Sequence, residues 1–282
     1  MRFLCLHGMG TSSDIFSSQL GVIIADLERL GHEFVFVDGL HECNTSSDVA
    51  AVYPGPYLCY YPLPTPELVR AAHEQIFDAI AEEGPIDAII SFSQGAALAA
   101  SILLQDAKEK PHEDMIGLAV FISASLPFDL DDETGADIWR STQDSAKRSL
   151  AAVSDPLASS QNFAKQVPTG NVRPGESCGE LSFDNAPGIP DDPYNFDGQL
   201  LRRYHPMELP FGMQIQIPSL HIFGNNDPYV GQARLLVELC DERMRSSITH
   251  SEGHSVPRGA TFRQKVVKAI SSKADGASFH RH

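Results

Sequence analysis

Two absences bound the class of protein. The 282 residues contain no apolar run long enough to span a membrane, which takes roughly 18 residues, and no basic segment followed by a short apolar one at the start. The five cysteines are odd in number and show no C-x-x-C spacing, which argues against a disulfide framework or a zinc site. We therefore expect a cytoplasmic protein without a membrane span.

Positive charge is also scarce. The chain has 21 Lys and Arg against 37 Asp and Glu, a formal net charge of −16. A protein that binds nucleic acid needs a basic surface that displaces counterions from phosphate, and no basic stripe runs through this sequence. Nucleic acid is therefore excluded as an expected partner.

Phosphate-binding and metal-binding motifs are incomplete. Gly8 and Gly10 begin a dinucleotide fingerprint, but the third glycine that G-x-G-x-x-G requires is Ser13. No P-loop lysine follows either. The segment 41–44, His-Glu-Cys-Asn, lacks a second ligand group at a useful spacing, which indicates a solvated loop. We expect neither a cofactor nor a metal.

The clearest sign of chemistry is the segment 87–97, DAIISFSQGAA. A β-branched, apolar run ends at Ser93, and then Gln94, Gly95 and small residues begin a helical stretch. This order is typical of a nucleophile elbow, a tight strand-to-helix turn that exposes the serine hydroxyl. The full pattern G-x-S-x-G has glycine where this chain has Ser91, so the motif is one residue short.

Two downstream residues complete the set that an activated serine needs. Its base takes up the proton, and a carboxylate orients the base. Asp227 follows an apolar run at 217–224, and His254 lies 27 residues later in a glycine-bearing loop. Because ligand sites of open α/β sheets lie beyond the carboxyl ends of strands, we predict a catalytic triad of Ser93, Asp227 and His254.

Each of these residues has a simpler explanation when taken alone. A serine after a strand is commonly a helix N-cap, an aspartate before proline is commonly a turn residue, and His254 is one of 11 histidines. His250 competes for the role of base, and Asp38 competes for that of the carboxylate. The order along the chain favours Asp227, and the loop position favours His254.

The oxyanion hole is predicted from two backbone N–H groups. In the α/β-hydrolase arrangement one donor is the residue after the nucleophile, here Gln94, and the other comes from the loop after the first strand. Gly8 lets that loop turn toward the substrate oxygen, so the N–H of Met9 is the second predicted donor.

The combined motifs resemble those of the fungal and yeast serine-hydrolase family often called FSH, which includes the ovarian-cancer-associated hydrolases. In chain order they are LCLHGMG, FVDG, ISFSQGAALAA, GNNDPYV and EGHSVP. The resemblance covers 1–125 and 216–272, and it implies an α/β-hydrolase core with the triad and oxyanion roles on the residues named above. The long middle region and YYPLP at 60–64 are similar to the fungal thioesterases that release polyketides from their synthases.

The resemblance implies transfer of an acyl group to water through an acyl-enzyme, from a small-molecule ester or thioester. We predict a thioesterase that releases a polyketide or similar acyl chain from a carrier domain of a polyketide synthase. The alternatives are a carboxylesterase acting on small free esters and a non-catalytic binding protein of the same fold. Acyl carrier domains are typically acidic, so docking needs a local basic patch, for which Lys108 with Lys110 or Arg202 with Arg203 are candidates.

Alternating strand and helix signals predict a mostly parallel six-stranded sheet with helices on both faces. Together with the α/β-hydrolase core that the resemblance implies, the expected fold is a trimmed α/β-hydrolase. Strands are expected near 2–7, 33–38, 86–92, 116–123, 217–223 and 246–250, with the spatial order 2-1-3-4-5-6. Helices are expected near 14–30, 66–83, 94–105, 231–244 and 257–272.

We expect one domain over 1–272, interrupted by an insertion at 126–207, and a frayed tail at 273–282. The insertion carries eight of the 19 prolines and no alternating strand pattern, and in this fold a lid commonly enters at this place. The aromatic residues predicted to contact the acyl chain are Trp139, Phe163 and Tyr204 in the insertion and Tyr61 outside it.

Overall fold

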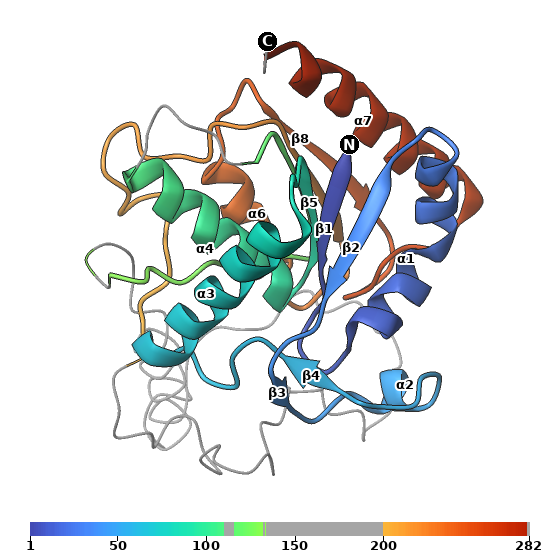
Figure 1. Ribbon diagram of the computed structural model, residues 1–282, viewed down its shortest axis with the longest axis horizontal. Coiled ribbons are helices and arrows are strands. Elements are labelled where there is room, and N and C mark those ends of the chain that lie inside the picture. Colours follow the sequence, from blue (N-terminus) through green and yellow to red (C-terminus); the bar gives the residue numbers. More distant parts are fainter. Residues whose placement is uncertain (110–115, 132, 134–199, 281–282) are drawn as a thin grey trace, which may run out of the picture.

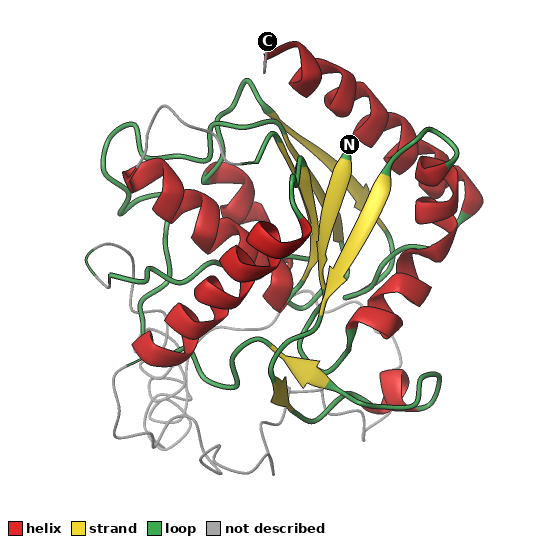
Figure 2. Cartoon of the chain, in the orientation of Figure 1, coloured by secondary structure: helices red, strands yellow, loops and turns green. Residues whose placement is uncertain are grey.

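The computed structural model describes residues 1–109, 116–131, 133 and 200–280. The strands of its main sheet are Arg2–Leu6 (β1), Glu33–Val37 (β2), Ala88–Phe92 (β5), Leu118–Ile122 (β6), Ser219–Gly224 (β7) and Arg245–His250 (β8). These six strands pair in parallel in the order β2-β1-β5-β6-β7-β8 (Figure 2). The predicted sheet and its order are therefore confirmed.

Helices cover both faces of this sheet (Figure 1). On one face lie α1 (Ser13–Glu28) and α7 (Ala260–His280), which contact each other. On the other face lie α3 (Pro66–Glu83), α4 (Gln94–Glu109) and α6 (Val230–Glu238). The chain thus forms the α/β-hydrolase type of layered structure.

The two faces have separate apolar cores. Strand β1 directs Phe3 and Cys5 into the core beneath α1 and α7, and Leu4 and Leu6 into the core beneath α3 and α4. Side chains alternate along a strand, so a strand that is covered on both faces must be mostly apolar along its whole length. This requirement explains why these segments are continuous apolar runs in the sequence.

One helix is shorter than the sequence indicated. Helix α6 ends at Glu238 and not near 244, because the chain turns at Leu239 and runs beside Ile215. Ile215 N–H donates to Leu239 O at 2.9 Å, and Cys240 forms a parallel bridge with Ile215. Leu239 and Cys240 are buried apolar residues in this turn, and they extended the apparent helical pattern.

Another helix is longer than the sequence indicated. Helix α7 begins at Ala260 and continues to His280, where the prediction had a helix ending near 272 and a frayed tail from 273. The Lys273 ammonium donates to Met244 O at 2.8 Å, and Ala274 is buried against the sheet, so the chain is held beyond the predicted end. No helix within the described ranges is long and apolar enough to cross a membrane.

A small hairpin lies beyond the carboxyl end of the sheet and was missed by the sequence analysis. It pairs His41–Glu42 (β3) with Leu58–Cys59 (β4) in antiparallel fashion, with a four-residue helix α2 (Ser47–Ala50) between them. Two-residue strands are too short to produce an alternating pattern, so nothing in the sequence marks them.

The predicted insertion begins and ends at a short paired stem. Asp129 N–H donates to Arg202 O and Tyr204 N–H donates to Pro127 O, both at 2.9 Å, and Phe128 bridges Arg203. The stem therefore brings the two ends of the insertion side by side. Most of the predicted lid, residues 132 and 134–199, lies outside the described residues.

Candidate active site

Ser93 occupies a strained turn between β5 and α4. Its φ of 51° is in the left-handed region, which non-glycine residues adopt at an energetic cost. Its N–H donates to Ile122 O at 3.0 Å, so the turn is attached to the neighbouring strand β6. A Cβ on Gly95 would lie 2.5 Å from both Leu6 O and His7 O. Glycine at this position therefore lets the helix start directly against β1.

Ser91 fits at the elbow position where the resembled family usually has glycine. Its side chain is fully buried, and its hydroxyl donates to Val120 O on β6 at 3.1 Å. The buried hydroxyl has no contact with water, and its hydrogen bond to the adjacent strand satisfies it instead. Ser93 has its positive φ although residue 91 is serine and not glycine.

The three residues of the predicted triad lie in one hydrogen-bonded chain. His254 Nε2 is 2.9 Å from Ser93 Oγ, and His254 Nδ1 is 2.9 Å from Asp227 Oδ2. Asp227 follows β7 and His254 follows β8, so all three side chains meet beyond the carboxyl ends of three parallel strands. An ionised Asp227 accepts a hydrogen bond from Nδ1–H, which leaves the lone pair of Nε2 directed at the serine hydroxyl.

The Asp227 carboxyl is buried but remains disposed to be ionised. Burial by itself raises its pKa and is the largest single effect, yet the hydrogen bonds and charge around the carboxyl, led by those of His254, together bring the pKa below its usual range. Tyr229 N–H, which donates to Asp227 Oδ1 at 2.8 Å, and the nearby Ser123 hydroxyl act in the same direction. A carboxylate held charged beside His254 also stabilises the imidazolium that forms when His254 takes a proton.

The two competing residues lie elsewhere. His250 is at the end of β8 and packs its ring edge-to-face against Phe262, with centroids 5.3 Å apart. Asp38 accepts a hydrogen bond from Ser13 N–H at 2.7 Å and lies 3.9 Å from His7. Neither side chain is bonded to Ser93 or to His254 within the part of the chain that the structure describes.

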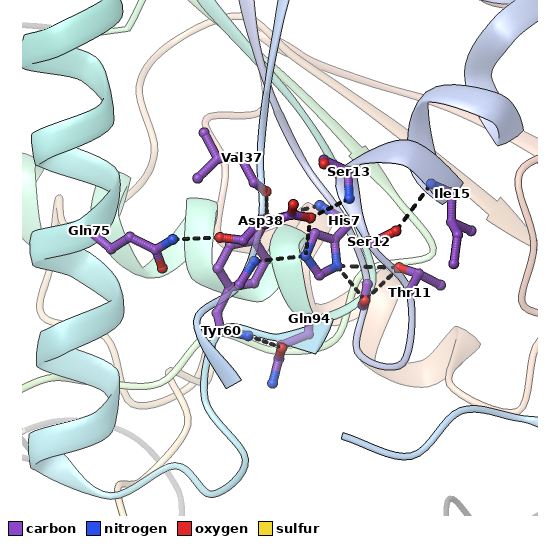
Figure 3. A network of polar contacts seen from close by, with 12 residues as sticks. His7, Thr11, Ser12, Ser13, Ile15, Val37, Asp38, Tyr60, Gln75 and Gln94 are labelled. Atoms are coloured by element: carbon purple, nitrogen blue, oxygen red, sulfur yellow. Dashed lines mark hydrogen bonds and ion pairs between the residues drawn. The ribbon is translucent and has the colours of Figure 1, made fainter. Parts of the chain in front are cut away.

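The buried side chain of His7 contacts the peptide that precedes the predicted donor Met9, and Figure 3 shows this ring among its polar partners. His7 Nε2 accepts from Gly39 N–H at 2.9 Å, so Nδ1 carries the proton and donates to Gly8 O at 2.7 Å. The Thr11 hydroxyl donates to the same carbonyl at 2.7 Å. In a trans peptide the C=O and the following N–H point in opposite directions, so anchoring Gly8 O also sets the direction of Met9 N–H.

The loop with Met9 lies directly against the elbow. A Cβ on Gly8 would lie 2.7 Å from the Phe92 ring and 3.2 Å from Ser93 Cβ. Among the described residues, the N–H groups of Met9 and Gln94 have no hydrogen-bond acceptor, and their role as oxyanion donors stays a prediction.

The side chain of Gln94 holds the segment that directly follows β4. Its Oε1 accepts from Tyr60 N–H at 3.0 Å and its Nε2 donates to Tyr61 O at 2.7 Å. Tyr60 in turn accepts from His7 N–H at 3.0 Å and donates to Val37 O at 2.9 Å (Figure 3). The sequence analysis did not single out the support that His7 and Tyr60 provide, although histidine directly before Gly8 was a visible signal.

The predicted substrate-contact residues are placed differently from the triad. Tyr61 and Tyr204 are buried in the core beneath α3 and α4, and Tyr61 packs edge-to-face on Phe128 with centroids 5.9 Å apart. Both therefore have packing roles in this structure. Trp139 and Phe163 lie outside the described residues. Within the described ranges, no group of three or more His, Cys, Asp and Glu side chains is arranged to hold a metal ion.

Comparison with known proteins gives consistent results. The family model described as serine hydrolase (FSH1) matches residues 1–266. The chain is 34% identical over 274 residues to esterase alnB of Emericella nidulans, covering 92% of this chain and 91% of that protein. It is 30% identical over 260 residues to hydrolase FUB4 of Fusarium oxysporum f. sp. lycopersici, covering 92% of each.

Solved structures support the fold alone. A putative hydrolase from Agrobacterium vitis S4 matches with a TM-score of 0.52 at 14% identity, over 96% of this chain and 87% of that one. At such identity, a shared fold carries no information about substrate.

Proposed function

Because the chain belongs to the serine hydrolase (FSH1) family, we propose that Ser93 is its nucleophile, His254 its general base and Asp227 the carboxylate that orients the base. The observation that carries this proposal is the continuous chain from Ser93 Oγ through the His254 ring to the Asp227 carboxylate, with both contacts at 2.9 Å. Contacts of that length allow proton transfer without rearrangement.

The first half of the reaction forms an acyl-enzyme. His254 Nε2 removes the proton from Ser93 as the hydroxyl oxygen attacks the substrate carbonyl. The N–H groups of Met9 and Gln94 donate to the oxyanion of the tetrahedral intermediate, and each donor is worth on the order of 3 kcal/mol. The protonated His254 then gives its proton to the leaving group, which departs.

The second half releases the acid. A water molecule takes the place of the leaving group, His254 removes its proton, and the resulting hydroxide attacks the acyl-enzyme carbonyl. The same two N–H groups bind the second oxyanion. Collapse of this intermediate returns the proton to Ser93 and frees the carboxylic acid.

We further propose that the acyl group arrives as a thioester, with release of a polyketide or similar chain as the biological reaction. This proposal is supported by the similarity of YYPLP at 60–64 and the long middle region to fungal polyketide-releasing thioesterases. The net charge of −16 counts against docking of an acidic carrier domain. Of the candidate basic residues, Lys108 is already paired with Asp131 and Glu133, at 2.6 and 2.9 Å.

A carboxylesterase acting on small free esters is the second candidate. It is favoured by the relatives of the chain, several of which are named esterases. The machinery described above serves both substrates, because the attack, the oxyanion and the acyl-enzyme are the same and only the leaving group differs.

One experiment tests both the assignment of Ser93 and the choice between a thioester and an oxygen ester as substrate. A fluorophosphonate should label the wild-type enzyme at Ser93, and Ser93→Ala should abolish the adduct while Ser123→Ala retains it; an unlabelled wild type would refute the nucleophile assignment. The same three proteins are then assayed for kcat/KM on one acyl chain presented as thioester and as oxygen ester. A preference for the thioester beyond its intrinsic reactivity supports the thioesterase proposal, and equal or reversed preference supports the carboxylesterase.

A further inference from the structure

Two cysteines lie in the β3–β4 hairpin, which is hydrogen-bonded to the loop of the predicted donor Met9. Cys59 ends β4, and Cys43 follows β3 directly, with its N–H donating to Tyr57 O at 2.9 Å. The register pairs His41 with Cys59, so Cys43 stands opposite Tyr57. Alternation along the strands then places Cys43 and Cys59 on the same face of the hairpin, as diagonal neighbours.

The two thiols interact and differ in access. The two thiols lie near enough to each other that each shifts the pKa of the other. Cys43 is partly exposed, whereas Cys59 is fully buried. The neighbouring Cys59 thiol lowers the pKa of the Cys43 thiol against the effect of burial, the Gly10 backbone adds to the lowering, and the pKa of Cys59 is raised in turn. An accessible sulfur with a favoured thiolate, next to a second thiol, has the features of a reactive cysteine with a resolving partner.

The remaining described cysteines have the opposite character. Cys5 lies within β1 and Cys240 lies in the turn after α6, and both are buried. Burial raises the pKa of both thiols, that of Cys240 to about 12. Neither presents a thiolate to solvent, so Cys43 is the reactive position among the described cysteines.

The hairpin is attached to both predicted oxyanion donors. Gly10 and Thr11 are the two residues that follow Met9. The carbonyl of Leu58, the neighbour of Cys59, accepts from Gly10 N–H at 3.0 Å, and the N–H of Leu58 donates to Thr11 O at 2.7 Å. On its other side, Tyr60 is bonded to the Gln94 side chain. A displacement of Cys59 is therefore transmitted to the loop of Met9 and to the residue after Ser93.

We propose that Cys43 and Cys59 are an oxidant-modified thiol pair, which closes to a disulfide and thereby lowers the activity of the site. With a peroxide as oxidant, the Cys43 thiolate attacks one peroxide oxygen, the O–O bond breaks, and a sulfenic acid and one water result. The Cys59 sulfur then attacks the Cys43 sulfur, an S–S bond forms and a second water leaves. Two thiols lose two protons and two electrons, and the peroxide is reduced to two waters.

The disulfide and the thiol pair require different hairpin geometries. Sulfurs in a disulfide are about 2 Å apart with Cβ atoms about 3.8 Å apart, closer than diagonal neighbours of an antiparallel pair. The hairpin must therefore shift to close the bond, and Leu58 and Tyr60 shift with it. Misplacement of catalytic groups by about 1 Å costs on the order of 10²-fold, so we expect kcat to fall at least ~10-fold.

The experiment treats the reduced full-length enzyme with a few equivalents of hydrogen peroxide. The expected result is a mass loss of two hydrogens, a Cys43–Cys59 cross-linked peptide, and a fall in kcat that dithiothreitol reverses. In Cys59→Ser, which lacks the resolving sulfur, Cys43 should instead be trapped as a sulfenic acid by dimedone. Cys178→Ser is the matched control, and it should still form the 43–59 disulfide.

Two results would overturn the proposal. One is that Cys43 and Cys59 both remain open to alkylation after unfolding of the peroxide-treated enzyme. The other is that the disulfide forms while kcat stays unchanged. The effect on activity rests on the proposed function, but the mass measurement does not. An enzyme that forms the disulfide and has no Ser93-dependent activity at any stage would thus refute the proposed function and leave the thiol pair standing.

Discussion

Ser93 and Ser123 occupy equivalent backbone positions on adjacent strands. Ser93 follows β5 with φ 51°, and Ser123 follows β6 with φ 45°. The N–H of Ser93 donates to Ile122 O, at the end of β6, at 3.0 Å. The N–H of Ser123 donates to Ile222 O in β7 at 2.7 Å. Both serines therefore bear the same left-handed strain at the carboxyl end of the same sheet.

The surroundings of the two hydroxyls differ. Ser93 is partly exposed and its Oγ contacts His254. Ser123 is fully buried, and its Oγ has no hydrogen bond of ordinary geometry to a described residue, although its hydroxyl lies near enough to Asp227 to help lower that pKa. The strained turn alone therefore does not distinguish the proposed nucleophile. Partial exposure and the contact with His254 are what separate Ser93 from Ser123.

Ser93→Ala is the variant expected to lose the most activity. We expect kcat/KM to fall at least ~10³-fold, because the base and the oxyanion donors remain but no nucleophile does. The variant should keep its fold, since alanine adopts a positive φ no less readily than serine. Steady-state kinetics and circular dichroism of the same preparation check both expectations, and near-normal turnover would refute the assignment.

The next largest effect is expected for Asp227→Asn. An amide accepts and donates, so it permits the wrong tautomer of His254 and cannot stabilise the imidazolium. We expect kcat to fall by a large factor, but by a factor at least about tenfold smaller than in Ser93→Ala. Fluorophosphonate labelling should slow in proportion. Equal labelling rates for the wild type and Asp227→Asn would contradict the role of the carboxylate.

Ser123→Ala tests the other half of the comparison. It removes a weak contribution to a carboxylate that keeps its bonds to His254 and Tyr229, so kcat should fall at most about fivefold. Stopped assays alongside Ser93→Ala give the contrast directly. A loss comparable to that of Ser93→Ala would show that the buried serine takes part in the chemistry.

The smallest effect on activity is expected for Ser91→Gly, which restores the usual elbow pattern. It removes the hydrogen bond to Val120 O and adds a glycine inside a strand, so the free energy of unfolding should fall by about 1–2 kcal/mol. Activity should stay within about threefold of wild type, because the φ of Ser93 does not depend on this side chain. Urea unfolding and kcat/KM measure the two quantities, and a strongly activated variant would show that Ser91 distorts the elbow.

The parts of the molecule that sequence patterns reveal are those with local causes. Ser93, Asp227 and His254 each follow a strand of the parallel sheet, and parallel strands bring their carboxyl ends together, so their meeting could be predicted from order alone. The support of Met9 by His7, Gly39 and Tyr60 joins residues far apart in the sequence through tertiary contacts. No periodicity marks such contacts, which is why they emerged only with the structure.

The paired stem at 127–129 and 202–204 also has a consequence for how such an enzyme diversifies. A segment whose two ends are joined at its base changes in length or composition without separating the strands on either side of it, and lengthening a closed loop costs little entropy. Exchange of that segment between relatives, cut at the stem, is therefore expected to leave the sheet that carries Ser93 unchanged.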